Sequence, residues 1–223
     1  MTIPPRGSAP SSKRPNTRSR GPLTPAVLTS LLLAILLVVG ALAAGFVAHE
    51  RATSTSLAHG AAADPPWPAP TGAERHARAD AAHLPNVYGA KLAEHIHTHL
   101  DITVDGRAEI VPGQIGLDEK HGFATALHTH NTSGIIHIES PVERDFTLGQ
   151  FFTEWNVRLD ARHVGSRGGD IGETLTVYVD GVRRAGDPAS IRLRDLDDID
   201  LVVAPAGVPT HPQPAFAWPS NYH

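Results

Sequence analysis

The chain has 223 residues, a formal net charge of -4 and no cysteine. The lack of cysteine excludes disulfides, thiolate nucleophiles, iron–sulfur clusters and thiolate zinc sites, so a metal would need nitrogen or oxygen donors. Basic side chains gather in residues 1–25, which hold five of them and no acidic residue: Arg6, Lys13, Arg14, Arg18 and Arg20. Because no basic stripe follows this segment, the sequence argues against a nucleic-acid partner.

Residues 26–48 are expected to form a transmembrane anchor. These 23 residues carry no charge and consist mainly of Leu, Ala and Val, and roughly 20 apolar residues span a bilayer as a helix. The positive-inside rule then makes residues 1–25 a cytoplasmic tail and predicts an extracytoplasmic C-terminal domain, with the lipid bilayer as a partner. The alternative is a cleaved signal peptide ending at Ala41-Leu42-Ala43, although the apolar part of such peptides is typically about 7–15 residues long.

The remainder divides by composition into three parts. Residues 49–84 are rich in Ala and Pro and show no lasting apolar period, which predicts a largely disordered linker with one short helix at Ala73 to Ala82. Residues 85–205 are expected to form the folded extracytoplasmic domain. Residues 206–223 contain repeated prolines and are expected to form an extended tail.

Several strands are predicted in the domain. Ile96 to Val104 alternates apolar and polar residues, and Asp105-Gly106 then predicts a tight hairpin turn. The same arrangement recurs where Leu175 to Val179 is followed by Asp180-Gly181. A last strand is expected at Ile199 to Val203.

One helix is predicted to begin after Thr147. Thr147 and Gln150 fit a capping box, and an apolar stripe follows at helical spacing, formed by Leu148, Phe151, Phe152 and Trp155. These side chains are expected to pack the helix on the strands. The predicted fold class is therefore α+β, with a small mixed or antiparallel sheet and one packed helix.

Histidines alternate in two rows. Side chains on a strand point to the same face at every second residue, so one row consists of His95, His97 and His99, and another of His128 and His130. Asn131 to Gly134 has turn composition. If these four residues form a hairpin loop, His128 lies opposite His137 and all three of His128, His130 and His137 share a face.

Imidazole is the commonest protein ligand for zinc and copper. The sequence therefore predicts a Cu²⁺ or Zn²⁺ site, in one or two parts, formed by His95, His97, His99, His128, His130 and His137. Asp101 and Glu139 follow in the same alternation, either as ligands or as acceptors for ligand imidazoles. Whether the two rows form one patch is left open, as is a polar face in which the histidines simply hydrogen-bond.

Three segments of the chain also carry a resemblance. They read HIHTHLDI from His95, LHTHNTSGIIHIESP from Leu127 and FTLGQFF from Phe146. Together they resemble a group of bacterial membrane-anchored or secreted proteins, over roughly residues 95–205, and this resemblance implies no particular reaction. Separately, the order of hairpin, helix and late strand is similar to that of β-grasp domains, in which two central strands are parallel.

The leading hypothesis is thus a membrane-anchored extracytoplasmic domain that binds a transition metal through a histidine face. An interaction or scaffold module with a pH-responsive histidine cluster is the main alternative, because clustered histidines titrate between about pH 5 and 8. A metal-dependent hydrolase, with Glu139 as general base, is a third reading. No nucleophile elbow, phosphate loop or H-E-x-x-H helix supports it, and the sequence names no protein partner.

Overall fold

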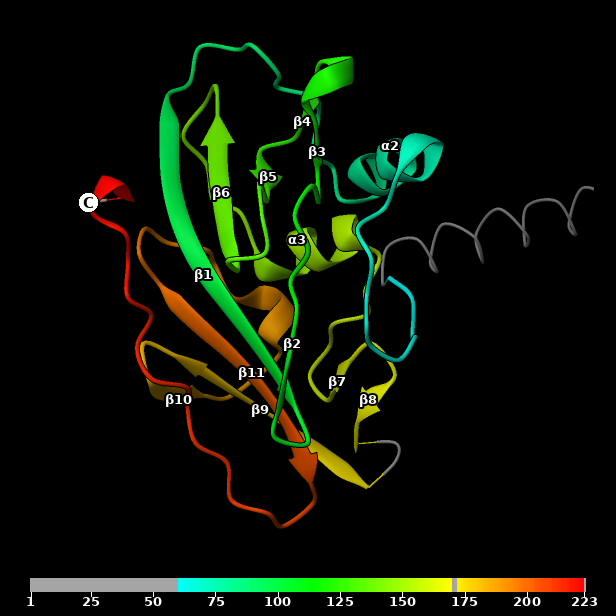
Figure 1. Cartoon of the computed structure of the whole chain (residues 1–223), viewed down its shortest axis with the longest axis vertical. Coiled ribbons are helices and arrows are strands. Elements are labelled where there is room, and N and C mark those ends of the chain that lie inside the picture. The colour runs from blue at the N-terminus through cyan, green and yellow to red at the C-terminus, as the bar shows by residue number, and fades with distance from the viewer. Residues whose placement is uncertain (1–59, 170–171, 223) are drawn as a thin grey trace, which may run out of the picture. The chain divides into compact units, whose positions relative to one another are not determined.

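The computed structural model describes residues 60–169 and 172–222, and within these the fold is α+β (Figure 1). Strand order in the main sheet is β10-β9-β11-β1-β6-β5, and β2 pairs with β1. Its strands are β1 (Glu94–Val104), β2 (Arg107–Glu109), β5 (Leu127–His128), β6 (Ile135–Ser140), β9 (Glu173–Val179), β10 (Val182–Arg184) and β11 (Asp198–Pro205). Two short ribbons consist of β3 (Leu117–Asp118) with β4 (Phe123–Ala124), and of β7 (His163–Val164) with β8 (Arg167–Gly168).

The sheet is mixed, because β1 runs parallel to β11 and antiparallel to β6. Both predicted hairpins are confirmed: Val104 pairs with Arg107, and Val179 pairs with Val182. Asp105 and Asp180 have φ values of 50° and 51°, and each precedes a glycine that also has positive φ, as a two-residue hairpin turn requires.

Helix α3 (Leu148–Trp155) begins where the capping box predicted. The Gln150 amide nitrogen donates to the Thr147 hydroxyl at 3.3 Å, and the Thr147 amide nitrogen donates to the Gln150 side chain at 3.1 Å. The apolar stripe of α3 is buried against the sheet, with Phe151 and Trp155 each 0 % exposed. Burial of this stripe on one face of the sheet supplies the core of the domain.

A second helix corrects two predictions. Residues 60–84 of the expected linker belong to the folded domain, and α2 (Gly72–Ala81) packs beside α3, so the domain has two packed α-helices in its described part rather than one. Arg78, which is 1 % exposed, donates from Nε to the Thr153 carbonyl oxygen at 2.8 Å. Trp67 meets Trp155 edge to face, with ring centroids 5.9 Å apart. These contacts depend on single well-placed side chains, which a periodicity search does not detect.

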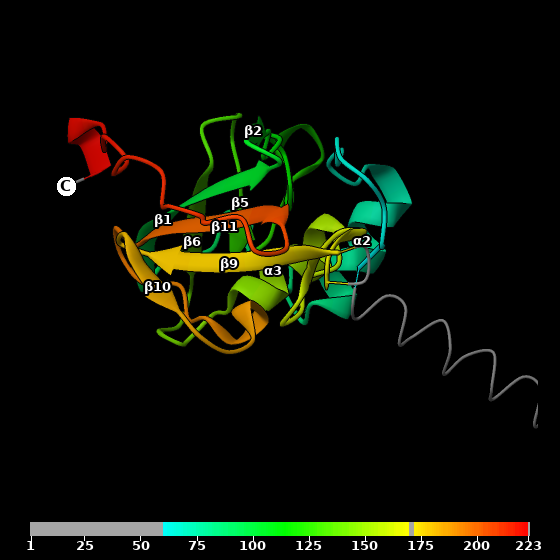
Figure 2. The same ribbon diagram turned by 90° about the horizontal axis from the view of Figure 1, so that it is seen from below.

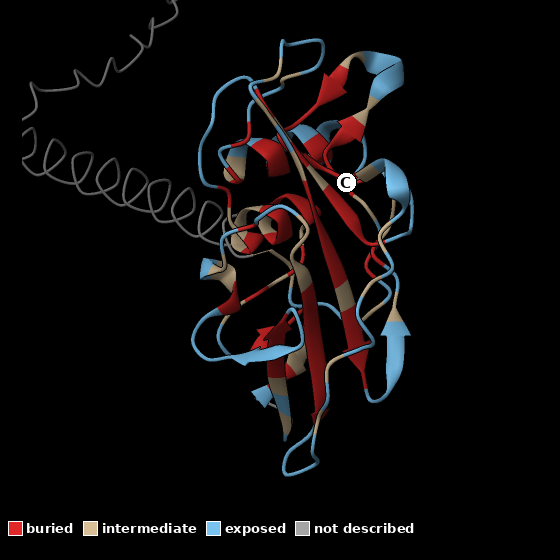
Figure 3. Cartoon of the chain, turned by 90° about the vertical axis from the view of Figure 1, so that its left-hand side faces the viewer, coloured by how far each residue is buried: buried red, intermediate tan, exposed pale blue. Residues whose placement is uncertain are grey.

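Three short 3₁₀ helices complete the described structure, at Glu119–His121, Pro188–Ser190 and Ser220–Tyr222. Buried residues run the length of the central strands, while turns and strand ends are exposed (Figure 3).

The expected C-terminal tail is extended, and it docks on the domain. Seen from below, α3 lies on one side of the sheet and the orange-to-red C-terminal segment passes over the other (Figure 2). The Gln213 amide nitrogen donates to Asp200 Oδ2 at 3.2 Å, and the Tyr178 hydroxyl donates to the Thr210 carbonyl oxygen at 2.8 Å. The tail therefore covers part of the sheet face that lacks helices.

Across residues 60–169 and 172–222, none of the helices combines the length and apolar character needed to cross a bilayer. The predicted cytoplasmic tail (residues 1–25) and anchor (residues 26–48) lie outside the described residues. Residues 49–59 of the predicted linker lie outside them as well.

Candidate metal centre

Three neighbouring strands bring the histidine rows together. In β1 and β6, His97 lies opposite His137 and His95 lies opposite Glu139. In β6 and β5, His137 lies opposite His128, as the predicted hairpin register required. Directly opposite residues share a face of the sheet, so both rows form one histidine face on the side away from α3.

His130 reaches this face by a different route from the one predicted. Strand β5 ends at His128, so His130 does not pair with Ile135 in the ladder. The Thr129 amide nitrogen instead donates to the Ile115 carbonyl oxygen at 3.1 Å. The His130 ring nevertheless lies against His128 and His137, with centroids 5.0 and 4.4 Å away.

Four side chains form the most complete metal-ligating group, called here the histidine cluster: His128, His130, His137 and Glu139. One candidate ligand atom from each lies within 4.8 Å of all the others. Glu139 Oε1 lies 3.9 Å from His128 Nε2, 3.7 Å from His137 Nδ1 and 3.3 Å from His95 Nε2. Ligand atoms around a tetrahedral zinc with bonds of about 2.05 Å are separated by about 3.4 Å, so only small side-chain movements separate this arrangement from a coordination shell.

The backbone fixes the orientation of the His128 ring. Its Nδ1 lies 2.9 Å from the Thr125 carbonyl oxygen, and a carbonyl can only accept a hydrogen bond. Nδ1 therefore carries the proton, and Nε2 directs its lone pair toward the cluster. A ligand imidazole whose second nitrogen donates to a carbonyl is typical of protein metal sites.

Burial and neighbouring groups keep the cluster in the ionisation state that metal binding needs. Burial lowers the pKa of His128 to about 4, and it also lowers the pKa of His130. The adjacent His137 imidazole, followed by the charges of His128 and His95, lowers the pKa of Glu139 to about 2. At neutral pH His128 and His130 thus offer imidazole lone pairs and Glu139 offers a carboxylate, as metal binding requires.

A second group shares His137 with the first. It consists of His95, His97 and His137, and the His97 ring lies 4.8 Å from that of His95 and 4.6 Å from that of His137. Burial, followed by the charges of His137 and His95, lowers the pKa of His97 to about 4. From the tail, the Tyr222 ring lies against His97 at 4.5 Å between centroids.

His99 stands apart from the other five predicted ligands. Although it continues the β1 row, it lies against β11, with Nδ1 at 2.8 Å from Asp198 Oδ1 and 4.0 Å from Asp101 Oδ2. Its Nε2 lies 3.1 Å from the Ser133 carbonyl oxygen. Asp101 accompanies His99 rather than the histidine cluster, whereas Glu139 belongs to the cluster.

Sequence reasoning missed several residues of this face. Asp198 and Asp200 lie opposite His99 and Asp101, and the alternation of Asp198, Ile199, Asp200 and Leu201 was the available signal.

Glu154, on the opposite side of the sheet, was not predicted either. It lies on α3 with 1 % exposure and has no hydrogen-bond partner for either carboxylate oxygen among the described residues. Burial raises the pKa of Glu154 to about 8.

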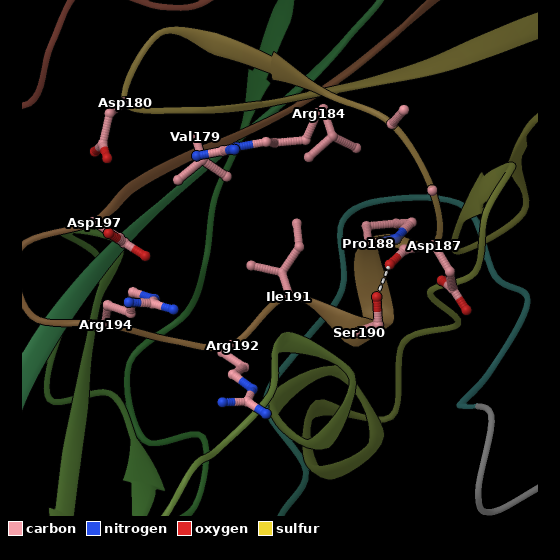
Figure 4. A pocket seen from close by; sticks show the side chains of 13 residues that line it. Val179, Asp180, Arg184, Asp187, Pro188, Ser190, Ile191, Arg192, Arg194 and Asp197 are labelled. Atoms are coloured by element: carbon pink, nitrogen blue, oxygen red, sulfur yellow. Dashed lines mark hydrogen bonds between the residues drawn. The ribbon is translucent and has the colours of Figure 1, made fainter.

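A separate hollow of about 580 Å³ lies between β9, β10 and the segment that follows Pro188 (Figure 4). Arg184, Arg192, Arg194 and Asp197 line it, together with Ile191. No histidine lines this hollow, so its walls do not bring the candidate ligands into a substrate cavity.

Comparison of the chain with protein-family models, curated proteins and solved structures found no match. What the structure defines is therefore an α+β domain whose mixed sheet holds histidine and carboxylate groups close enough to bind a metal ion.

Proposed function

We propose that this protein is a membrane-anchored, extracytoplasmic binder of Cu²⁺ or Zn²⁺, and that the histidine cluster is its principal site. The observation that carries the proposal is the position of Glu139 Oε1 between the imidazole nitrogens of His95, His128 and His137, at 3.3 to 3.9 Å. The anchor and its orientation rest on the charge-free residues 26–48 and the basic residues before them.

A hydrogen-bonded polar face explains these groups less well than a metal does. The His137 Nδ1 atom is buried and has no hydrogen-bond partner among the described residues. A buried polar atom without a partner costs roughly 1–3 kcal/mol. A divalent cation would satisfy His137, the His128 Nε2 lone pair and the Glu139 carboxylate together, which is the reason to prefer metal binding.

The donor set suits both proposed metals. Three imidazoles and a carboxylate match the tetrahedral nitrogen and oxygen coordination of Zn²⁺, and the adjacent His95 and His97 could complete the tetragonal shell that Cu²⁺ prefers. A pH-responsive scaffold is less well supported. The pKa values of His97 and His128, each about 4, place the titration of these residues below the range in which such a switch operates.

The test is titration of the full-length chain in detergent with Zn²⁺ and with Cu²⁺, followed by calorimetry. The variant His128→Ala/His130→Ala is expected to bind at least about 100-fold more weakly, because it loses two ligands. The matched control His121→Ala/His211→Ala also removes two histidines, both exposed and outside the cluster. Equal affinities in the two double variants would refute the site.

Membrane anchoring is tested separately from metal binding. We expect the full-length protein to remain in the membrane fraction after alkaline carbonate extraction, and a variant lacking residues 26–48 to become extractable. Protease added to intact spheroplasts should degrade the C-terminal domain. A protected domain would contradict the proposed orientation.

A further inference from the structure

The His99 group lies apart from the histidine cluster and has a different donor chemistry. His99, Asp101 and Asp198 offer ligand atoms within 4.8 Å of one another. They come from two parallel strands, β1 and β11, in which His99 lies opposite Asp198. The group therefore combines one imidazole with two carboxylates.

His99 lies between a carbonyl oxygen and a carboxylate, both within hydrogen-bond distance of its ring nitrogens. His99 Nε2 faces the Ser133 carbonyl oxygen at 3.1 Å, and since a carbonyl only accepts, Nε2 carries a proton. If that is the only ring proton, Nδ1 directs a lone pair at the Asp198 carboxylate 2.8 Å away. Two acceptors at this distance repel each other unless a cation lies between or beside them, and that cation is either a second proton or a metal ion.

The third carboxylate of the patch, that of Asp200, has a hydrogen-bond partner at only one of its two oxygens among the described residues. Asp200 lies opposite Asp101 on β11 and is 2 % exposed. Its Oδ1 atom is buried and has no hydrogen-bond partner among the described residues, while Oδ2 accepts from the Gln213 amide nitrogen at 3.2 Å. The patch thus holds three carboxylates, from Asp101, Asp198 and Asp200, and one imidazole, a set of groups that a bound cation would stabilise.

The tail encloses the group without blocking the ligand atoms. The Phe216 ring stacks on His99 with centroids 3.6 Å apart and planes 11° apart, and its amide nitrogen donates to Asp198 Oδ2 at 2.8 Å. Stacking covers the face of the imidazole, whereas a metal would bind at its edge, in the ring plane. The Asp101 side chain is 42 % exposed, which leaves a route of entry from solvent.

We infer that His99, Asp101 and Asp198 form a second cation site, suited to a hard divalent ion such as Mn²⁺. Carboxylate and water ligands suit hard ions such as Mn²⁺, whereas imidazole ligands suit Zn²⁺ and Cu²⁺, so this group accepts a harder ion than the histidine cluster does. The separations from Nδ1, 2.8 Å to Asp198 and 4.0 Å to Asp101, are close to the cis and trans ligand spacings of an octahedron with bonds of about 2.1 Å, which are about 3.0 and 4.2 Å. This site does not depend on the histidine cluster being occupied.

The test uses the full-length chain in detergent with one equivalent of Zn²⁺ already added to fill the histidine cluster. Mn²⁺ is then titrated, and the loss of the free Mn²⁺ electron paramagnetic resonance signal reports binding. One Mn²⁺ per chain is expected in the wild type, and Asp198→Asn should weaken binding at least 10-fold. His128→Ala/His130→Ala should keep Mn²⁺ binding even if it loses Zn²⁺ binding. The failure of one proposed site can therefore be distinguished from the failure of the other.

Asp160→Asn is the matched control. Asp160 pairs with the buried His163 at the same Nδ1 to Oδ1 distance of 2.8 Å, but His163 is in no group of three ligands among the described residues. This variant should bind Mn²⁺ as the wild type does. Circular dichroism checks folding, and if Asp198→Asn is unfolded, Asp101→Asn decides because its side chain is partly exposed. No Mn²⁺ bound to the wild type, or equal affinity in the folded Asp198→Asn or Asp101→Asn variant, would overturn the inference.

Discussion

The two faces of the sheet are built from the same strands and yet differ in almost every physical property. On the face toward α3, β1 places Leu100 and Ile102, each 1 % exposed, in the apolar core. On the other face the same strand places His95, His97 and His99, with carboxylates on the strands beside it. One face stabilises the fold by burying apolar surface, and the other collects imidazole and carboxylate groups.

This difference shows how the domain can carry a costly site. Burial of a large apolar side chain contributes roughly 1.5–3 kcal/mol, and the core face contains many such residues. His137 Nδ1 and Asp200 Oδ1 are buried and have no hydrogen-bond partner among the described residues, and such atoms reduce that stability. If the two faces are energetically separate, substitutions on one should change stability and substitutions on the other should change metal affinity.

Adjacent residues on β6 give the strongest test of this separation. Ile136 is 0 % exposed on the core face, so Ile136→Ala is expected to lower the free energy of unfolding by about 2–5 kcal/mol and to leave Zn²⁺ affinity of the folded protein unchanged. His137→Ala is expected to lower Zn²⁺ affinity more than about 100-fold with a much smaller loss of metal-free stability. Denaturant unfolding and calorimetry measure both quantities. Large losses of affinity in both variants would mean that the faces are coupled.

Glu154 breaks the pattern, because it is a carboxyl group on the core side. Its pKa of about 8 in the folded protein exceeds the ordinary value of 4.5. The folded state therefore binds more protons than the unfolded state between these values, and stability must fall as pH rises from 4.5 to 8. Glu154→Gln should remove this fall, on the order of 3–4 kcal/mol, as measured by urea unfolding at pH 5 and pH 8.5.

For Glu154, the unfolding free energies at the two pH values are compared within the same protein, first in the wild type and then in the variant. The difference in unfolding free energy between pH 5 and pH 8.5 should be smaller in Glu154→Gln than in the wild type. An identical difference in both proteins would show that Glu154 is ionised when folded.

The histidine face predicts the opposite pH dependence in the metal-free protein. His128 is 2 % exposed and has a pKa of about 4, below the ordinary 6.5. Between these values the unfolded state binds more protons, so stability falls as pH drops from 6.5 to 4, by up to about 3 kcal/mol. Thermal unfolding in chelator should show this fall, and His128→Asn should reduce it. Saturating Zn²⁺ should counteract the fall in the wild type alone, because the ion competes with the proton.

The tail gives the smallest expected effect. Phe216→Ala removes the ring stacked on His99 and should lower the free energy of unfolding by about 1 kcal/mol. Zn²⁺ affinity at the histidine cluster should stay the same, because Phe216 contacts none of the cluster ligands in the described structure. A drop in Zn²⁺ affinity would show that the tail organises the cluster as well as the His99 group.

Local signals predicted the elements that local physics determines. Asp105-Gly106 and Asp180-Gly181 accept the positive φ values of tight turns, and Thr147 with Gln150 satisfies the free amides at the start of α3. The register that sets His128 opposite His137 was predicted correctly, although the connection between β5 and β6 is longer than the four residues expected, because His130 leaves the ladder. Helix α2 matches the short helix expected at Ala73 to Ala82, but its packing in the domain was not predicted, because the helix is polar and its buried Arg75 and Arg78 depend on tertiary contacts.

By itself the sequence determined which residues alternate on each strand, because the two-residue period of an extended chain is a local property. That was enough to put His95, His97 and His99 on one face and to name imidazole as the donor. Only the tertiary structure decided which strands are neighbours. Pairing of β1 with β6 on one side and β11 on the other sends His97 toward His137 and His99 toward Asp198. The reason is physical: strand order is set by burial of the shared apolar face against α3, a property of the whole chain that no short segment encodes.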